Sequence, residues 1–501
     1  MNDRSFVEEA RHEKLAAIRA LGVNPFAYRF ERTHLAAAAI DAFEAAQGGA
    51  DTDAPRVTVR VAGRIMGRRG HGKTTFLHIV DPSGPVQVYA KRDDVGEDAY
   101  ALVKLLDLGD HIGVRGYMFR TRTGEVTVHA ETVELLSKAL RPLPTGKQDA
   151  EGEQHGDLHD PELRARQRYA DLAVHPERRQ VFELRARVIS ALRHFLDAKG
   201  FLEVETPVLQ PLYGGALARP FTTFYNVLDS DFYLRIATEL YLKRCIVGGL
   251  EAVYEIGKDF RNEGVDRTHN PEFTMLEFYR AYMDYYDIME MTEEMVHGVV
   301  VEISGSETVE RFDTTFDFTR PWPRRPYVEL IQQHAGIDLA TATIEELRNA
   351  LNERDVEDTA SMGYIKAVDE VFGTFVEPNL VQPTFVIDYP IELSPLAKPK
   401  RGNDRLAERF ELYVNGQELA NAFSELNDPE DQRARFEAQA KAGADGDDEA
   451  HVIDEDYVRA MEYGMPPTGG FGMGVDRLVM LLAEEHSIRE VILFPMLRPE
   501  V

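Results

Sequence analysis

Between residues 56 and 137, apolar and polar side chains alternate in short segments, which is the pattern of half-buried β-strands. In RVTVRVAGRI, Val57, Val59 and Val61 fall on one face. TFLHIV, VQVYA, HIGVRGYMF and EVTVHA repeat the alternation, and turn residues separate strands at 81–84 and 123–124. Five short strands within about 80 residues predict a small closed barrel of the OB-fold type.

Helical spacing replaces alternation on both sides of this barrel. FVEEARHEKLAAIRAL predicts a helix that ends at Gly22. Beyond the barrel, the apolar face of a second predicted helix consists of Leu184, Val188, Leu192 and Phe195. FLEVETPVL then predicts a strand closed by Pro207, and strands and helices mix through to residue 501. The second part of the chain is therefore predicted to be one large α+β domain.

Polar segments divide the chain. Residues 143–162, rich in glycine and proline, predict a linker, and residues 441–450 predict a surface loop. We expect His155 and His159 to lie on a mobile loop and not to bind metal. The predicted organisation is a helical extension at 1–50, the barrel at 51–143, a linker at 144–165 and the α+β domain at 166–501.

Composition limits function and location. The 501 residues include 57 basic and 86 acidic side chains, a net charge of −29, which argues against wrapping of nucleic acid over the whole surface. The single cysteine, Cys245, excludes an internal disulfide and a cysteine-rich zinc site. No apolar stretch approaches the roughly 18 residues of a membrane span. A soluble, cytoplasmic protein that does not enter membranes is predicted.

The stretch GRRGHGKT, residues 67–74, matches the phosphate-binding pattern G-x-x-x-x-G-K-[ST]. A P-loop needs a helix after its lysine, because helical N–H groups and the helix dipole hold the phosphates. Lys73 is followed instead by TTFLHIV, which is β-branched and aromatic. We predict a basic hairpin connection. It is either a solvated charged loop or, with Phe76 and Gln87 on the adjoining strands, a surface for unstacked RNA bases.

The segment FRNEGVDRTHNPEFTMLEFY, residues 260–279, predicts two strands joined by a polar loop. Alternation puts Phe273, Glu277 and Tyr279 on one face, and Arg261 ends the first strand. That face offers a cation for phosphate or carboxylate, an aromatic ring for a base, and an acid for a cationic group. The alternative is a buried structural network of ion pairs.

In FELYVNGQELANAFSEL, residues 410–426, Asn415-Gly416 predicts a two-residue hairpin turn. Pairing across it sets Tyr413 opposite Glu418 and Glu411 opposite Ala420, so the two glutamates are diagonal neighbours. Two carboxylates at this spacing suit Mg²⁺ that bridges phosphates. Strict alternation turns three later residues to the opposite face from Glu418; they are Asn421, Phe423 and Glu425. They can face the same pocket only if a β-bulge lies near Ala420–Ala422.

GGFGMGVDRLVMLL, residues 469–482, predicts a glycine-bearing strand that leads into a helix opening at Asp476. Gly470, Gly472 and Gly474 either let a ligand approach the strand closely or serve tight packing of the helix on the sheet. Arg477 would project from the first helical turn. No strand–turn–helix unit with a later acidic residue surrounds the glycines, so a dinucleotide fingerprint is not indicated.

GFLEVETPVL, FRNEG…HNPEFT and GFGMGVDR resemble the three signature motifs of the class II aminoacyl-tRNA synthetases. RQRYADL, GGALARPF, YLRIATELYLKR, SPLA, SELND and ILFPMLRP extend the resemblance in order over nearly the whole chain. In this detail the chain is similar to the bacterial-type lysyl-tRNA synthetases. The resemblance implies an anticodon-binding OB-fold barrel followed by a catalytic domain built on an antiparallel sheet flanked by helices.

The resemblance also implies roles for individual residues. The expected ATP site is Arg261, Glu263, His269, Asn270, Phe273, Glu411, Glu418 and Arg477. The expected lysine site is Gly215, Glu239, Arg261, Glu277, Tyr279, Asn421, Phe423 and Glu425. The expected anticodon-binding residues are Arg64, Phe76, Gln87 and Glu125. Arg261 and Arg477 would be catalytic, and Glu411 and Glu418 would hold Mg²⁺, with about three ions expected from the family. Thr238 and Ala422 depart from the proline and glycine frequent in the family, which affects only local pocket shape.

The implied activity is ATP-dependent ligation of L-lysine to tRNA(Lys) through a lysyl-adenylate, by a cytoplasmic homodimer whose first motif, near Pro207, forms the interface. The carboxylates at Glu277 and Glu425 agree with a cationic substrate, because a buried carboxylate needs a partner. Three alternatives stay open at this point. They are a ligase that transfers lysine to a protein or small molecule, a catalytically silent RNA-binding protein, and a P-loop ATPase that uses Lys73.

Overall fold

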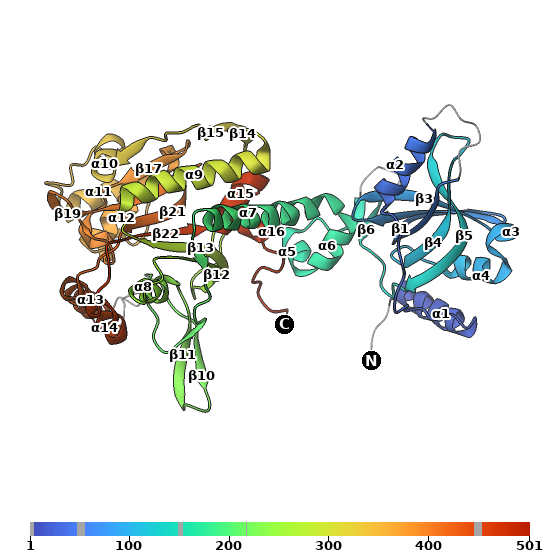
Figure 1. The fold of residues 1–501 in the computed structure, drawn as a ribbon, viewed down its shortest axis with the longest axis horizontal. Coiled ribbons are helices and arrows are strands. Elements are labelled where there is room, and N and C mark those ends of the chain that lie inside the picture. Colours follow the sequence, from blue (N-terminus) through green and yellow to red (C-terminus); the bar gives the residue numbers. More distant parts are fainter. Residues whose placement is uncertain (1–4, 48–55, 149–153, 217, 445–452, 501) are drawn as a thin grey trace. The chain divides into compact units, whose positions relative to one another are not determined.

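The computed structural model describes residues 5–47, 56–148, 154–216, 218–444 and 453–500. The chain forms two compact units, Met1–His159 and Asp160–Val501 (Figure 1). No helix in these described ranges is long and apolar enough to cross a membrane.

The first unit is a closed five-stranded barrel, as predicted, with strand order β1-β2-β3-β5-β4. Its strands are β1 (Thr58–His71), β2 (Thr74–Asp81), β3 (Gly84–Lys91), β4 (His111–Arg120) and β5 (Val126–Ser137). Alternate residues point inward, so that Val59, Val61 and Leu77 are buried in the barrel core. The alternation read from the sequence therefore places one face of each strand against a common apolar interior.

Short helices cover the barrel. They are α1 (Phe6–Ala20), α2 (Ala36–Gln47), α3 (Arg92–Val95) and α4 (Glu97–Leu105). Ser5 and Glu8 form a capping box at the start of α1, and Ile18 packs into the barrel core. The predicted end of this helix is confirmed, because Gly22 follows with a φ of 75°.

Lys73 lies in the tight turn between β1 and β2, where His71 pairs with Thr74. Residue 74 begins a strand and not a helix. The phosphate-binding geometry of a P-loop is therefore absent from this stretch, and the predicted hairpin connection is confirmed.

The segment predicted to be a linker contains two short paired strands. β6 (Thr145–Gln148) pairs antiparallel with β7 (Gln154–Asp157), so the expectation of a loop at His155 was wrong. His159 follows β7 outside any helix or strand. The first residues of the predicted loop at 441–450 continue helix α13 (Pro429–Ala444), and residues 445–450 lie outside the described ranges.

The second unit is built on an eight-stranded sheet with order β16-β17-β20-β21-β22-β13-β12-β8. The strands are β8 (Leu202–Glu203), β12 (Ala252–Phe260), β13 (Glu272–Ala281), β16 (Arg324–Pro326), β17 (Thr384–Ile387), β20 (Arg409–Val414), β21 (Gln417–Ser424) and β22 (Thr468–Gly474). The predicted antiparallel pairing holds for the central strands. The outer pairs β16–β17 and β12–β8 are parallel, which makes the sheet mixed.

Three helices pack on one face of this sheet and bury its main apolar core (Figure 1). They are α7 (Arg179–Ala198), α9 (Tyr285–Ser304) and α15 (Val475–Ala483). Val188 and Leu192 of α7 are fully buried, as the helical spacing predicts. Because this face of the sheet is filled by helices, the opposite face is the one on which a ligand can bind.

The remaining helices and strands extend the unit around this framework. They are α5 (Pro161–Arg166), α6 (Arg168–Val174), β9 (Leu209–Gln210), β10 (Thr222–Tyr225), β11 (Ser230–Leu234), α8 (Glu239–Val247), β14 (Thr308–Arg311), β15 (Thr314–Asp317), α10 (Tyr327–Ala335), α11 (Ile344–Asn352), α12 (Tyr364–Phe375), β18 (Pro399–Lys400), β19 (Asn403–Ala407), α14 (Glu455–Glu462) and α16 (Ile488–Val491), with 3-10 turns η1 (Pro176–Arg178), η2 (Thr359–Ser361), η3 (Glu377–Asn379) and η4 (Ile391–Leu393). The strand predicted from FLEVETPVL is only two residues long in β8. Past it, the backbone N–H of Thr206 donates to the Glu255 side chain (3.0 Å), and Pro207 has no N–H to donate to a ladder.

Candidate active site

A cavity of about 410 Å³ lies on the sheet of the second unit and takes residues from β13, β20, β21, β22 and α15. The predicted ATP and lysine residues that line it are Gly215, Glu239, Arg261, Glu263, His269, Asn270, Phe273, Glu277, Tyr279, Glu411, Glu418, Asn421, Phe423 and Arg477. Glu425 does not line the cavity and is buried beside it. The three separate sequence segments therefore meet in one place.

The floor of the cavity is a strip without side chains on β22. Gly472 pairs with Glu277 on one side and with Asn421 on the other, and Gly470 pairs in the same way with Tyr279 and Phe423. A Cβ atom built on Gly470 would lie 1.8 Å from a Glu425 carboxylate oxygen and 2.6 Å from the Tyr279 ring. The glycines thus allow side chains of the two flanking strands to close over the central strand.

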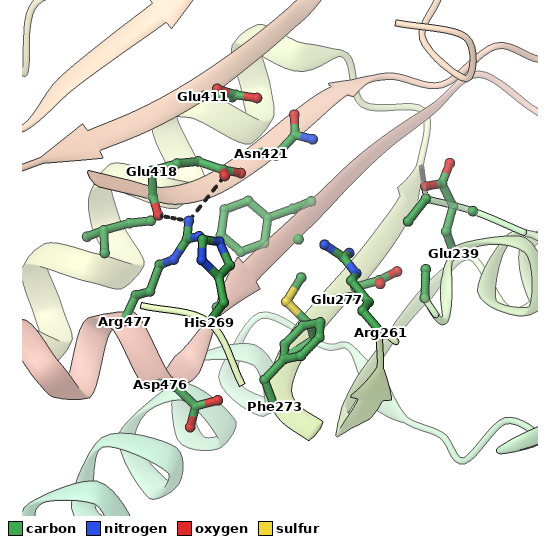
Figure 2. A pocket seen from close by; sticks show the side chains of 18 of the residues that line it. Glu239, Arg261, His269, Phe273, Glu277, Glu411, Glu418, Asn421, Asp476 and Arg477 are labelled. Carbon is green, nitrogen blue, oxygen red and sulfur yellow. Dashed lines mark hydrogen bonds and ion pairs between the residues drawn. The ribbon is translucent and has the colours of Figure 1, made fainter. Parts of the chain in front are cut away.

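Arg261 and Phe273 face each other at one part of this cavity (Figure 2). The guanidinium of Arg261 lies 5.0 Å from the centre of the Phe273 ring, a cation–π contact that orients both groups. The Arg261 backbone N–H donates to the carbonyl of Pro271 (2.9 Å), which closes the polar loop between β12 and β13. A planar cation and an aromatic face are therefore presented together.

His269 and Arg477 lie side by side at the next position (Figure 2), with His269 Nε2 and Arg477 Nη2 3.3 Å apart. Asp266 holds the other ring nitrogen of His269 at 2.8 Å. Burial acts against ionisation of Asp266, but hydrogen bonds from His269 and Thr268 lower its pKa to about 2. The loop side of the cavity is thus held by an ionised carboxylate.

The hairpin β20–β21 confirms one predicted pairing and corrects another. Asn415 and Gly416 turn with φ of 55° and 68°, and Tyr413 pairs with Glu418. Glu411 pairs with Asn421 and not with Ala420, because Leu419 is an extra residue on β21. This bulge, one residue before the predicted position, turns Asn421 and Phe423 to the same face as Glu418.

Glu411 is buried among donors. Its Oε1 accepts from Arg409 Nη2 (2.6 Å), and its Oε2 accepts from the hydroxyls of Tyr389 and Tyr413 (2.7 Å each). Burial raises the pKa of the Glu411 carboxyl, Arg409 opposes that shift, and the nearby Glu418 carboxylate adds to it. Sequence reasoning missed Arg409, although its position two residues before Glu411 on one strand places both side chains on the same face.

Glu418 lies beside a second cation. Arg477 Nη1 donates to the Glu418 backbone carbonyl (2.7 Å) and to its carboxylate (3.2 Å) (Figure 2). A carboxylate has about four lone-pair sites, so both glutamates keep acceptor capacity toward the cavity. No cluster of three or more metal-ligating side chains exists among the described residues. Two carboxylates without a full protein cage fit Mg²⁺, which takes most of its ligands from water and substrate phosphates.

Buried carboxylates occupy the other end of the cavity. Glu277 Oε1 accepts from the backbone N–H of Thr238 (3.2 Å), and its Oε2 accepts from the Tyr279 hydroxyl (3.1 Å). Burial, together with the charges of Asp259 and Glu239, raises the pKa of Glu277 to about 8. Such a carboxyl is well placed to receive a cationic group.

Lys243 completes this end of the site and was missed from the sequence. Its ammonium pairs with Glu239, one turn earlier on α8, and with Glu425 after β21. The four-residue spacing in ELYLK is a signal for a helical ion pair, but the contact with Glu425 joins residues that are distant in sequence. Glu425 therefore has a resident cationic partner.

The residues predicted to bind the anticodon lie on the barrel. Gln87 Nε2 donates to Glu125 (2.6 Å), and Thr127 Oγ1 donates to Gln87 Oε1 (2.9 Å). Phe76 is half-buried and packs on Tyr89 with ring centres 4.9 Å apart. Arg64, on β1, has a long contact from Nη1 to the Gly109 carbonyl (3.4 Å). An aromatic face and an oriented amide thus lie on neighbouring strands.

Comparison with known proteins agrees with this geometry. Residues 160–498 match the family model of class II tRNA synthetases (D, K and N), and residues 59–136 match the OB-fold nucleic acid binding domain of the anticodon type. The chain is 52% identical to the lysine–tRNA ligase of Pelotomaculum thermopropionicum over 99% of this chain and 96% of that protein. It is 51% identical to the lysine–tRNA ligase of Carboxydothermus hydrogenoformans over 98% of each. The chain belongs to the class II tRNA synthetase family, among the lysine–tRNA ligases.

Proposed function

We propose that the cavity activates L-lysine with ATP and that the barrel selects tRNA(Lys) by its anticodon. The chain is a lysine–tRNA ligase, and the reaction proceeds through lysyl-adenylate and releases AMP and pyrophosphate. The observation that carries the proposal is the charge arrangement of one cavity. Arg477 lies on one side of the cavity and Glu239 on the other, and Arg261 and Glu277 lie between them (Figure 2). The two arginines would bind the polyphosphate, and the two carboxylates would bind the amino groups of lysine.

At the nucleotide end, Phe273 would stack on adenine and Arg261 would contact both the α-phosphate and the lysine carboxylate. The 5.0 Å contact between them supports this pairing, because it holds a cation suited to phosphate next to an aromatic ring suited to a base. The other nucleotide contacts are assigned to Glu263, His269, Asn270 and Arg477. The family uses ATP and Mg²⁺. Glu411 and Glu418 would hold Mg²⁺, of which about three ions are expected, and the ions would neutralise phosphate charge when bound.

At the amino-acid end, Gly215 and Glu239 would receive the α-amino group, and Asn421 would help Arg261 at the carboxylate. Phe423 would pack on the aliphatic stem. Glu277, Tyr279 and Glu425 would form the end of the pocket at the ε-ammonium. A carboxylate-lined pocket rejects uncharged side chains, because its buried acids would then stay unpaired.

The first chemical step follows from these positions. A carboxylate oxygen of lysine attacks the α-phosphorus of ATP, the bond from that phosphorus to the β-bridging oxygen breaks, and pyrophosphate leaves. Arg261 and Arg477 hold the reactants in line and stabilise the added negative charge, without a protein nucleophile. The 3′-terminal ribose hydroxyl of tRNA then attacks the carbonyl carbon of the adenylate, and AMP leaves.

We expect a homodimer, in the cytoplasm where its tRNA substrate is used. Large apolar residues are exposed on β8, β9 and the β10–β11 hairpin, including Leu202, Leu209 and Val227, with exposures of 52%, 54% and 83%. Exposed apolar residues that gather in one patch mark an interface, and we propose that these form one. Pro207 lies between Leu202 and Leu209 in the sequence.

Replacing Leu209 with aspartate should therefore give a monomer, because a charge at the centre of an apolar interface loses its hydration on association. Sedimentation velocity measures the change against the wild-type protein. Tyr463→Asp, at an exposed aromatic residue of the helical α14 region, is the matched control and should stay dimeric. A wild-type protein that sediments as a monomer would contradict the proposed dimer.

Lysine alone among the twenty amino acids should support ATP–pyrophosphate exchange without tRNA. Arg261→Ala should lower that exchange by about 10²–10³-fold, the usual cost of removing one transition-state donor. Arg187→Ala, at an exposed arginine of α7, is the matched control and should exchange at the wild-type rate. An unchanged rate in Arg261→Ala would remove Arg261 from the site, and exchange with a different amino acid would overturn the assignment of the pocket.

The KM for lysine should rise as the pH falls below about 8, because Glu277 is then protonated in the free enzyme. Binding an ammonium requires the ionised form, so each pH unit below the pKa costs up to about tenfold in apparent affinity. Above the pKa the carboxylate is already ionised and the effect ends. Glu277→Gln should raise the KM for lysine at all pH values and flatten the profile, while the KM for ATP changes little. A profile that keeps its shape in Glu277→Gln would assign the ionisation to another group.

Phe76→Ala should lower kcat/KM for tRNA by about 5–150-fold, the range that corresponds to the loss of one base–aromatic stack of about 1–3 kcal/mol. ATP–pyrophosphate exchange without tRNA, measured on the same sample, checks that the second unit, which holds the cavity, is still active. Tyr28→Ala is the matched control, because this aromatic residue of the first unit is fully exposed. Unchanged charging by Phe76→Ala would favour a ligase that transfers lysine to another acceptor.

A further inference from the structure

Asp476 lines the cavity but has none of the roles assigned above. It precedes Arg477 in the first turn of α15 (Figure 2), and its side chain is only 2% exposed. One of its carboxylate oxygens accepts from Arg185 Nη1, and the other accepts from the Thr274 backbone N–H (2.7 Å). Both oxygens of this buried carboxylate are therefore held by donors of the protein.

Arg185 reaches this carboxylate from α7, one of the helices that cover the other face of the sheet. Its Nη2 donates to the Thr274 hydroxyl (2.8 Å), and its Nη1 lies 3.3 Å from the Val491 carbonyl at the end of α16. No other ion pair among the described residues includes Arg185 or Asp476. One guanidinium thus joins α7, β13 and α15, which come from three separate segments of the sequence.

We propose that Arg185 is a positioning residue for the nucleotide. Through Asp476, it fixes the gap between Phe273 and Arg477, the two side chains on either side of the place proposed for ATP. This inference rests on the nucleotide site proposed above and adds to it a residue outside the cavity lining. Arg185 acts through β13 and the first turn of α15, without contact with the reacting atoms.

The hydrogen bonds of the sheet do not by themselves join β13 to α15. Pairing between β13 and β22 ends at Met275 and Gly474, because the chain then turns into the helix. Thr274 lies one residue beyond this last pair, and its N–H donates to the Asp476 carboxylate in place of a strand carbonyl. A side chain therefore continues the connection between the two elements at the nucleotide end of β13.

The first turn of α15 is held from two sides. Arg477 donates to the Glu418 carbonyl (2.7 Å) and carboxylate (3.2 Å), which ties the turn to β21. Asp476 ties the same turn to β13 and α7. Because Phe273 directly precedes Thr274, a shift of this turn changes the gap between Phe273 and Arg477. Misplacement of reacting groups by about 1 Å can lower a rate about 10²-fold.

The connection depends on the charge of Arg185. A buried carboxylate that loses its cationic partner is strongly destabilised. Without Arg185, the Asp476 carboxylate would turn toward water in the cavity, and the first turn of α15 would move with it. The Thr274 N–H would then lose its acceptor as well. We therefore expect removal of the guanidinium to affect the nucleotide end of the cavity before the lysine end.

The test compares steady-state constants of the full-length enzyme in lysine-dependent ATP–pyrophosphate exchange. Arg185→Met keeps the length of the side chain and removes its donors. It should lower kcat/KM for ATP by about 10²-fold with a clear rise in the KM for ATP, while the KM for lysine stays within about twofold. Arg185→Lys, which keeps the charge without the second donor group, should lie between the two proteins. An unchanged KM for ATP in Arg185→Met would overturn the proposal.

Two other substitutions on α7 separate positioning from loss of stability. Leu192→Ala opens a cavity in the apolar core, so it should lower the melting temperature and leave the KM for ATP unchanged. Arg187→Met removes an exposed guanidinium that contacts the Glu302 carbonyl (3.2 Å), and it should leave both quantities unchanged. If Leu192→Ala raises the KM for ATP as much as Arg185→Met does, the effect is one of general stability and the proposal fails.

A double-mutant cycle tests whether Arg185 acts through Asp476. Asp476→Asn removes the charge that Arg185→Met would leave unpaired. The double variant should therefore be no less active than Arg185→Met alone, because the two side chains act as one unit. Losses that multiply in the double variant would show that Arg185 acts through another group, which would overturn the proposal.

Thermal unfolding checks that each variant is folded. Should Arg185→Met not fold, Thr274→Val removes one hydroxyl and keeps the ion pair. It should raise the KM for ATP at least about threefold, because one guanidinium donor then lacks its partner, and an unchanged KM would reject the proposal. The wild-type enzyme tests the proposed function separately. If it shows no exchange with lysine, the nucleotide site itself fails, whereas normal wild-type exchange with an unchanged KM for ATP in the variants rejects only the role of Arg185.

Discussion

The strip of glycines on β22 is the constraint on which the active-site cavity depends. This strand runs between β13 and β21, and on its cavity face Gly470 and Gly472 have no side chains. Side chains from the two flanking strands therefore meet over it, with Glu277 and Tyr279 on one side and Asn421 on the other. A single Cβ at Gly470 would collide with the Tyr279 ring. The cavity exists because β22 has no side chains on this face. Its other face carries Phe471 and Met473 into the apolar core.

A second constraint is that buried charges need partners. The cavity gathers carboxylates at Glu239, Glu277 and Glu411, and most of them already have donors from the protein: Arg409 for Glu411 and Lys243 for Glu239. Glu277 lacks a cation. Because Glu239 and Glu411 already have cationic partners in the protein, Glu277 is the carboxylate that needs a cation from the substrate. In the same way, Arg261 stacks on Phe273 without a carboxylate partner among the described ion pairs, and an anionic substrate group can supply one.

The sequence predicted the barrel and most of the side chains that meet in the cavity, because alternation and turn residues act locally. β1 to β5 followed directly from period-two patterns, and the faces of β13 followed from the same rule. What it could not predict were contacts between distant segments. The extra residue at Leu419 changes which residues face the cavity, and no local signal distinguishes it from regular pairing. Lys243 was missed for the same reason, because its contact with Glu425 arises only when α8 and the end of β21 are brought together. Arg409 had a local signal, its place two residues before Glu411 on β20, and was overlooked.

The phosphate-loop letters at 67–74 show how context decides between interpretations of a short motif. Gly72 and Lys73 form a hairpin turn in the barrel, and Thr74 begins a strand, so no helix N-terminus is available to bind phosphate. In the second unit, glycines that resemble a dinucleotide fingerprint lie in a strand, and their absent side chains make room for other residues instead of exposing N–H groups. Both motifs contain the same residue type for opposite physical reasons. The first needs a positive φ at Gly72, and the second needs a residue without a side chain at Gly470, because the Glu425 carboxylate and the Tyr279 ring occupy the space above it.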